Sequence, residues 1–359
     1  MGNGRSSTGV TEVLRKMIDA GRIAPGQYLP TTRELCKQHE VSNHTVIKAL
    51  KSLEIAGLLK SEPRHGYRVT AQANDPERGC PIAFLLSSGN LIGGMDSFYS
   101  HLGRLIADNG NKRGWETVKI VIERDENSGV FERLKQMRCG GVILDTVYPD
   151  VLAKAKQSGL PTVVVDAWDP AEQFDAVVQD DFGGGELAAK HLLAAGHKRI
   201  AWFGPNKTTY HATKRFSGAM SVLADAGLPF SHDVRLSFSD PKLVASARAM
   251  LESAQRPTAV IVLWLPMLSA LLEAARELGI VVGRDLDVVG WCAEEVHGSS
   301  YAPLFKKEPV APAVVWSAAS MAATAVSRLA ERRSHPELNC VRTNIPVSLK
   351  MPAKPEGAQ

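Results

Sequence analysis

Residues 25–69 constrain the fold of this chain more than any other stretch. Thr31, followed three residues later by Glu34, forms a capping box that starts a helix. Ser42 caps a second helix, whose apolar positions recur at helical spacing until a stop at Gly57. The stretch therefore predicts two short helices joined by a turn.

A hairpin is expected after the second helix. Two extended runs, residues 58–60 and 67–69, lie on either side of the turn formers Pro63 and Gly66. Two helices and a hairpin in this order form a winged helix-turn-helix, and we assign residues 1–72 to that domain.

The chemistry of this domain fits duplex DNA. Polar side chains occupy the first turn of the second helix, where a recognition helix meets base edges. Residues 1–72 hold 11 Lys/Arg against 6 Asp/Glu, whereas the rest of the chain holds 31 against 32. The alternative is a helical hairpin with a solvated polar face, which the wing and the long ordered match to the pattern disfavour. The polar residues are Ser42, Asn43, His44 and Thr45, and the nearby cations are Lys48, Lys51, Lys60, Arg64 and Arg68.

Over about residues 10–70 the chain resembles the DNA-binding domain of the GntR family of bacterial transcription regulators. The family usually has arginine where this chain has Asn43, and often a basic residue near Ile47, so its operator preference does not carry over. The resemblance implies that Arg33, Asn43, His44, Thr45, His65 and Gly66 face DNA. The residues that carry it include Pro25-Gly26, Leu29-Pro30, Arg33-Glu34-Leu35, Val41-Ser42, Thr45-Val46, Ala49-Leu50, Leu53-Glu54 and Gly57-Leu58.

The chain as a whole has the composition of a globular protein of two to three domains. It has 359 residues, of which 44% are hydrophobic and 22% charged. Its five cysteines are far apart and lack zinc-site spacing, and no apolar run resembles a signal peptide or membrane span. No nucleophile elbow or phosphate loop is present. We expect a cytoplasmic, non-catalytic protein without membrane association, metal or cofactor.

A linker over residues 73–80 precedes a larger body. From residue 81, short apolar runs alternate with amphipathic stretches, which predicts parallel βαβ units. One open sheet of so many strands would be unusual, so we expect two doubly wound α/β lobes over residues 81–350. We expect the chain to cross between lobes near residues 180, 305 and 335, with a helix near 314–332, an extended run over 341–349 and a tail over 351–359.

This body resembles the effector domain of the LacI family, which is akin to periplasmic sugar-binding proteins. Among the residues that carry the resemblance are Gly159-Leu160-Pro161-Thr162, Val178-Gln179-Asp180-Asp181, Gly196-His197-Lys198-Arg199-Ile200 and Asp287-Val288-Val289-Gly290-Trp291. A GntR-type head on such a body is the arrangement of the arabinose-repressor group of regulators.

The resemblance also implies an effector site between the lobes. Arg215 occupies the place of an arginine that binds the effector in the family. An Asn-Asp pair usually ends the strand where this chain has Trp264-Leu265, and an aspartate usually stands where this chain has Cys292. Trp rings stack on the apolar faces of sugars, so Trp264 and Trp291 are candidates too. Asp180 is the fifth candidate, although an aspartate before a glycine run more often caps a helix.

Each effector candidate also has a structural interpretation. Trp264 and Trp291 can fill lobe cores, and Arg215 can form a surface ion pair. The leading hypothesis is a homodimeric transcription repressor that binds double-stranded operator DNA and a small molecule such as a carbohydrate. Two alternatives stay open. One is a DNA-binding regulator whose body has lost its ligand and serves dimerisation or partner contact, and the other is a binding or enzyme module with an incidental head.

Overall fold

The computed structural model describes residues 6–19, 22–55, 57–63, 65–70, 80–88, 96–123, 129–145, 148–166, 173–205, 210–306 and 308–352. Arg64, most of the expected linker and most of the expected tail lie outside these residues.

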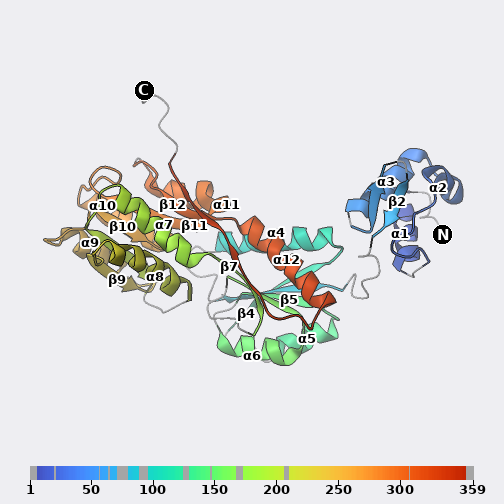
Figure 1. The fold of residues 1–359 in the computed structure, drawn as a ribbon, viewed down its shortest axis with the longest axis horizontal. Coiled ribbons are helices and arrows are strands. Elements are labelled where there is room, and N and C mark those ends of the chain that lie inside the picture. The colour runs from blue at the N-terminus through green and yellow to red at the C-terminus, as the bar shows by residue number, and fades with distance from the viewer. Residues whose placement is uncertain are drawn as a thin grey trace, which may run out of the picture.

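The head is a winged helix-turn-helix (Figure 1). Both halves of the predicted capping box are present: Glu34 N donates to Thr31 Oγ1, and Thr31 N donates to the Glu34 carboxylate. A first helix, not foreseen in the sequence, supplies Val10, Leu14 and Ile18 to the head core. The elements are α1 (Ser7–Asp19), α2 (Thr32–His39), α3 (Asn43–Ile55), β1 (Leu59–Glu62) and β2 (Gly66–Val69).

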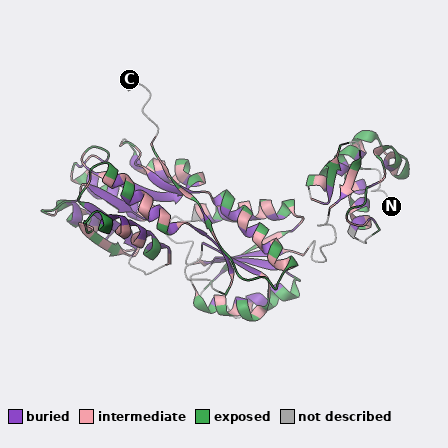
Figure 2. Cartoon of the chain, viewed as in Figure 1, coloured by how far each residue is buried: buried purple, intermediate pink, exposed green. Residues whose placement is uncertain are grey.

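The N-terminal lobe is a six-stranded sheet of order β13-β7-β6-β5-β3-β4, in which every pairing is parallel. The four inner strands are wholly buried, as parallel strands covered on both faces should be (Figure 2). Its elements are β3 (Ile82–Ser87), α4 (Asp96–Lys112), β4 (Thr117–Ile122), α5 (Val130–Gln136), β5 (Gly141–Asp145), α6 (Pro149–Ser158), β6 (Thr162–Val165), β7 (Asp175–Gln179), α12 (Ala318–Ser334) and β13 (Arg342–Ile345).

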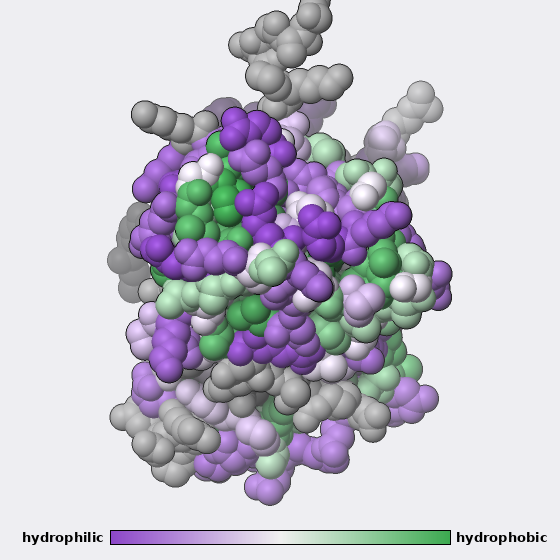
Figure 3. All heavy atoms as spheres, turned by 90° about the vertical axis from the view of Figure 1, so that its left-hand side faces the viewer, coloured by the Kyte–Doolittle hydropathy of each residue, from purple (hydrophilic) through white to green (hydrophobic). Residues whose placement is uncertain are grey.

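The C-terminal lobe is a second six-stranded sheet, of order β14-β12-β11-β10-β8-β9, with only β14 antiparallel. Hydrophilic and hydrophobic side chains alternate over its outer end (Figure 3). Its elements are α7 (Asp181–Ala194), β8 (Ile200–Pro205), α8 (Tyr210–Asp225), β9 (His232–Leu236), α9 (Leu243–Glu252), β10 (Ala259–Val262), α10 (Leu265–Glu277), β11 (Asp287–Ala293), α11 (Glu294–Val296), short helical turns over His297–Tyr301 and Ala302–Phe305, β12 (Ala313–Trp316) and β14 (Val347–Lys350).

The chain passes between the lobes at Asp180, Ser317 and Pro346. The first passage lies at the expected residue 180, but the other two lie later than the expected 305 and 335. The reason is that residues 313–316, partly assigned to a helix from the sequence, form buried strand β12 between β11 and β14. The helix begins only after Ser317, whose hydroxyl accepts a hydrogen bond from Ser320 N. The expected extended run 341–349 divides into β13 and β14, one for each sheet.

Helices α7 and α8 pack against each other through glycine. A Cβ on Gly185 would lie 2.0 Å from the carbonyl oxygen of Arg215, and one on Gly218 would lie 2.0 Å from that of Phe182. Side chains at these two positions would force the helices apart. The close approach holds the N-terminus of α7 beside α8, where the candidate effector residues lie.

Candidate functional sites

The first candidate site is the exposed start of α3 in the head. Ser42, Asn43, His44 and Lys48 are exposed and Thr45 is half-buried. Ser42 Oγ accepts a hydrogen bond from Thr45 N at 3.2 Å and lies 2.8 Å from Thr45 Oγ1, so both hydroxyls hold the first turn. The amide of Asn43 and the ring of His44 therefore project from a helix start whose own cap is satisfied.

Of the predicted wing residues, His65 and Gly66 are exposed, and Gly66 has a φ of +94° that favours glycine. Arg68, counted among the nearby cations in the sequence, pairs with Glu62 at 2.8 Å, and Tyr28 donates to the same carboxylate. Its charge is thus partly neutralised within the head. Arg33, in the first turn of α2, is exposed.

The second candidate site is a closed ring of hydrogen bonds that joins the two lobes. Gln179, at the end of β7, donates from Nε2 to Asp166 Oδ1 at 2.8 Å. Arg215 of α8 donates from Nη2 to Gln179 Oε1 at 2.9 Å and from Nε to Asp181 Oδ1 at 2.7 Å. His211 closes the ring, with Nδ1 2.6 Å from Asp181 Oδ2 and Nε2 3.0 Å from the Asp166 carbonyl oxygen. All five side chains are buried. We call these five residues the interlobe ring.

The ring carries alternating charge. Burial alone would lower the pKa of His211, but the carboxylates of Asp181 and Asp166 outweigh it and raise that pKa to about 9. Burial alone would raise the pKa of Asp181, yet His211 and Arg215 lower it to about 2. At neutral pH, therefore, a protonated imidazole and a guanidinium lie on either side of the Asp181 carboxylate.

Aromatic side chains fix the edges of the ring. The guanidinium carbon of Arg215 lies 4.2 Å from the Trp291 ring centroid, and Trp291 Nε1 donates to Gln179 Oε1 at 3.0 Å. Gly184 leaves room for this indole, because a Cβ there would lie 2.2 Å from Trp291 Cη2. From the N-terminal lobe, the Tyr99 hydroxyl donates to Asp166 Oδ2 at 3.4 Å.

The other sequence candidates lie outside the ring. Asp180 caps α7 by accepting a hydrogen bond from Gly183 N at 3.1 Å. Trp264 packs edge-on against Phe238, with ring centroids 5.6 Å apart. Cys292 is buried in the apolar core on the opposite face of β11 from Trp291, and burial raises the pKa of its thiol to about 12. The structure thus brings Arg215 and Trp291 together, and leaves Trp264 and Cys292 apart from them.

Sequence reasoning missed five polar members of this site, which are Tyr99, Asp166, Gln179, Asp181 and His211. One signal was available, because His211 and Arg215 are four residues apart and so share a face of α8. Tyr99, Asp166 and Gln179 lie in separate parts of the N-terminal lobe. They meet only when parallel strands align their carboxyl ends at one edge of a sheet.

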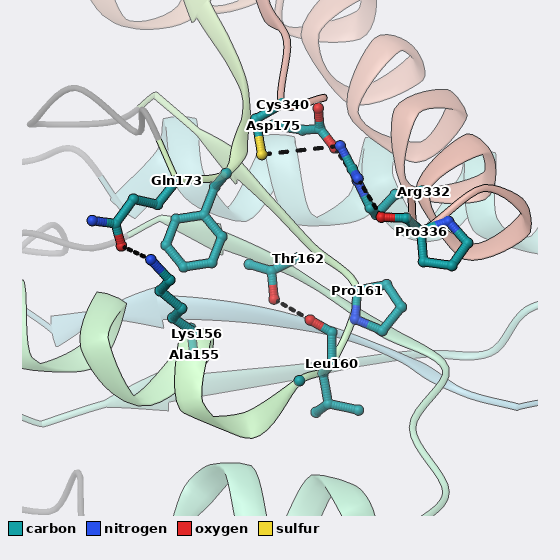
Figure 4. A pocket seen from close by; sticks show the side chains of 12 residues that line it. Ala155, Lys156, Leu160, Pro161, Thr162, Gln173, Asp175, Arg332, Pro336 and Cys340 are labelled. Carbon is teal, nitrogen blue, oxygen red and sulfur yellow. Dashed lines mark hydrogen bonds and ion pairs between the residues drawn. The ribbon is translucent and has the colours of Figure 1, made fainter. Parts of the chain in front are cut away.

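A separate pocket of about 230 Å³ lies where the strands of the N-terminal lobe begin (Figure 4). Its charged groups bond within the protein: Lys156 Nζ donates to Gln173 Oε1 at 2.8 Å, and Arg332 Nε donates to Asp175 Oδ2 at 2.7 Å. Arg332 also donates to the carbonyl oxygens of Pro336 and Asn339. This pocket is a seam between packed segments, at the opposite end of the strands from the interlobe ring.

Among the described residues, no group of three or more His, Cys, Asp or Glu side chains could hold a metal ion. None of the helices in the described ranges is long and apolar enough to cross a membrane.

Family models match nearly the whole described chain. The model for bacterial regulatory proteins of the gntR family matches residues 6–69. The model for periplasmic binding proteins and the sugar-binding domain of the LacI family matches residues 91–263, and the periplasmic binding protein-like domain matches residues 189–351.

Characterised relatives are transcription regulators. The HTH-type transcriptional regulator DegA of Bacillus subtilis is 28% identical over 54% of this chain and 60% of its own length. The arabinose metabolism transcriptional repressor of Geobacillus stearothermophilus is 24% identical over 78% of this chain and 79% of its own length. The chain spans less than two thirds of the first two relatives it matches.

A solved complex of the transcriptional regulator CelR with cellobiose has the same fold. Its TM-score is 0.63 at 19% identity, and the match covers 90% of this chain and 99% of that one. The winged helix-turn-helix head and the two lobes with parallel sheets are the domains that the family models match. The chain therefore consists of a gntR-family DNA-binding domain followed by a periplasmic binding protein-like body of the LacI type.

Proposed function

We propose that this protein is a cytoplasmic, homodimeric transcription repressor whose affinity for its DNA operator is set by a small polyhydroxylated molecule, such as a sugar. The observation that carries this proposal is the interlobe ring, in which Asp166 and Gln179 of one lobe meet Asp181, His211 and Arg215 of the other.

The ring has the chemistry to bind vicinal hydroxyl groups. A guanidinium offers several donors in a fixed fork, a carboxylate accepts, and the Gln179 amide does both. A sugar that entered between the lobes could replace the bonds Arg215–Gln179 and Gln179–Asp166 with bonds to its own hydroxyls. The indole of Trp291 would then offer an apolar face for the sugar ring.

Two comparisons support a sugar as the effector. A repressor of arabinose metabolism is similar to this protein over most of the chain. The regulator CelR, which has the same fold, was solved in complex with the sugar cellobiose. The loss of the family's polar anchors at Trp264 and Cys292 is offset here by Gln179, Asp166 and His211.

Binding at the ring would act on DNA through the lobes. A ligand that bridges them changes their relative orientation, and with it the way two subunits pair and the spacing of their heads on paired half-sites. The ligand changes operator affinity only to the extent that it binds the DNA-competent and DNA-incompetent forms with different affinities.

The first experiment is affinity selection of randomised duplexes with the purified full-length protein at moderate salt. We expect a pseudo-palindromic motif, because a two-fold dimer reads two half-sites. A protein that enriches no motif and binds no duplex at low salt would contradict the proposed function.

Asn43→Ala is expected to weaken binding to the selected operator by about 1–3 kcal/mol, because its amide can pair with a base edge. Affinity for unrelated duplexes should change little, since those contacts are to phosphates. Fluorescence anisotropy with both duplexes measures the two effects. Ser52→Ala, an exposed position near the other end of α3, is the matched control. If Asn43→Ala and Ser52→Ala lost the same amount of operator affinity, Asn43 would not contact the bases.

A thermal-shift screen with mono- and disaccharides tests the effector. A sugar present at 100 times its Kd is expected to stabilise the body by about 2.7 kcal/mol, and the same sugar should change operator affinity. Sugars that leave both the melting temperature and the operator affinity unchanged would favour a body that serves dimerisation or partner contact instead.

A further inference from the structure

A cluster of cations surrounds the point at which the head is joined to the body. Residue Cys80 leads into β3, whose start is flanked by two loops: Gly140 N donates to the Pro81 carbonyl oxygen at 2.8 Å, and Ile82 N donates to that of Glu116 at 2.8 Å. Five cations lie on or beside these loops, and we call them the basic edge. They are Lys112, Arg113, Lys135, Arg138 and Arg333.

Contacts on both loops hold the basic edge together. The guanidinium carbon of Arg333 lies 4.4 Å from the Trp115 ring centroid, and a Cβ on Gly140 would lie 2.8 Å from Arg333 Nη2. Arg113 Nη2 donates to Ser327 Oγ at 3.3 Å and its guanidinium lies over the same indole. Arg333 therefore bridges the loops before β4 and β5, which flank β3 in the sheet.

The outer cations of the basic edge are available to a partner. Lys112, Lys135 and Arg138 are exposed, and no carboxylate of the described residues lies within ion-pair distance of them. Glu116, also exposed, is the acidic residue of the loop between them. The edge thus carries a local excess of positive charge, although the chain beyond residue 72 is nearly neutral overall.

Favourable interaction with helix dipoles does not account for this excess. Cations in the last turn of a helix are stabilised by its dipole, and that rule applies to both lobes alike. In the C-terminal lobe, however, α8 and α9 have no basic residue in the last turn, and Arg276 at the end of α10 pairs with Glu308 at 2.6 Å. In the N-terminal lobe, α4, α5 and α12 all end in Lys or Arg. These helix ends of the N-terminal lobe lie at the edge of the sheet where the chain enters from the DNA-binding head.

We propose that the basic edge binds the phosphate backbone of the operator's flanking DNA, as a second contact beside the head; this inference rests on the DNA-binding function proposed above. Thr70, directly after the wing strand, and Cys80 are ten residues apart, so their Cα atoms are separated by at most about 35 Å. The basic edge is thereby tethered close to the duplex that the head binds. Phosphates are the partner that the exposed side chains of Lys112, Lys135 and Arg138 fit.

The test is the salt dependence of DNA affinity for the triple variant Lys112→Gln, Lys135→Gln, Arg138→Gln. Each phosphate contact contributes about 0.9 to the slope of log affinity against log salt concentration, so we expect the slope to fall by about two to three units for each subunit whose basic edge contacts the flanking DNA. This loss should appear on a duplex with long flanks and not on one trimmed to the footprint of the heads. Isothermal titration or anisotropy over a range of NaCl concentrations measures both.

The matched control is the triple variant Lys198→Gln, Lys242→Gln, Arg256→Gln, which removes the same charge from exposed positions of the C-terminal lobe. A basic-edge variant whose slope on the long duplex equals that of the control overturns the proposal, as does an equal fall on the trimmed duplex. A wild-type protein that binds neither duplex would instead contradict the DNA-binding function itself, so the two failures are distinguishable.

Discussion

Arg215→Met is expected to lower the free energy of unfolding of the body by about 3–5 kcal/mol, the usual cost of removing one partner from a buried ion pair. The carboxylate of Asp181, 3% exposed, would lose the donor that now lies 2.7 Å away. Gln179 Oε1 would lose a donor as well. Methionine keeps the length and much of the volume of the arginine stem, so the loss reports charge pairing more than a cavity.

Urea unfolding followed by tryptophan fluorescence measures this loss in the body, because all six tryptophans lie beyond residue 80. Arg284→Met is the control: this arginine also pairs with an aspartate, Asp285, but its side chain is 70% exposed, and we expect a much smaller loss because solvent screens the pair. Equal losses in the two arginine variants would show that the interlobe ring contributes no more than a surface pair.

The head was the most predictable part of this chain, because local chemistry determines it. The capping pair Thr31 and Glu34, the Ser42 cap and the turn at Gly66 act within a few residues of one another, and the structure contains all three. Helix α1 escaped prediction although its apolar residues recur at helical spacing, since its acidic first-turn signal is absent. The two-lobed α/β architecture followed from the alternation of buried strands and helices.

The positions at which the chain passes between the lobes were less predictable, because an apolar segment near a passage can join either sheet. Residues 313–316 continue smoothly into an amphipathic helix in the sequence, and only the vacant place between β11 and β14 makes them a strand. In the same way, nothing local divides residues 342–350 between two sheets except Pro346, which lacks the donor a continuous strand needs.

Resemblance to a family can locate single effector candidates in the sequence, but it does not show which of them lie together in the structure. Trp291 and Cys292 are consecutive residues of one strand, so their side chains must point to opposite faces, and both could not face the same ligand. Arg215 was located by resemblance, but its partners Gln179 and Asp181 lie more than thirty residues away. Their convergence depends on the register of β7 and the glycine contact between α7 and α8.

The second large effect is on pH dependence. The pKa of His211 is about 9 in the folded protein, where Asp181 and Asp166 overcome the effect of burial, against about 6.5 in an unfolded chain. A raised folded-state pKa means that the stabilisation is complete below about pH 6.5 and is lost as the pH rises through 9. We therefore expect the free energy of unfolding to fall by on the order of 3 kcal/mol between pH 6.5 and 9.5.

Urea unfolding at several pH values, for the wild type and for His211→Gln, isolates this contribution, since other titrations are common to both proteins. The variant should be less stable at pH 6.5 and approach the wild type near pH 9.5. Asp181 acts in the opposite direction: its pKa is lowered to about 2, so its contribution is present above about pH 4 and is lost only as the pH falls below that value. The ring should thus be most stable between about pH 4 and 6.5. A constant difference between the two proteins across this range would mean that His211 is not charged in the ring, and that Arg215 alone balances the Asp181 carboxylate.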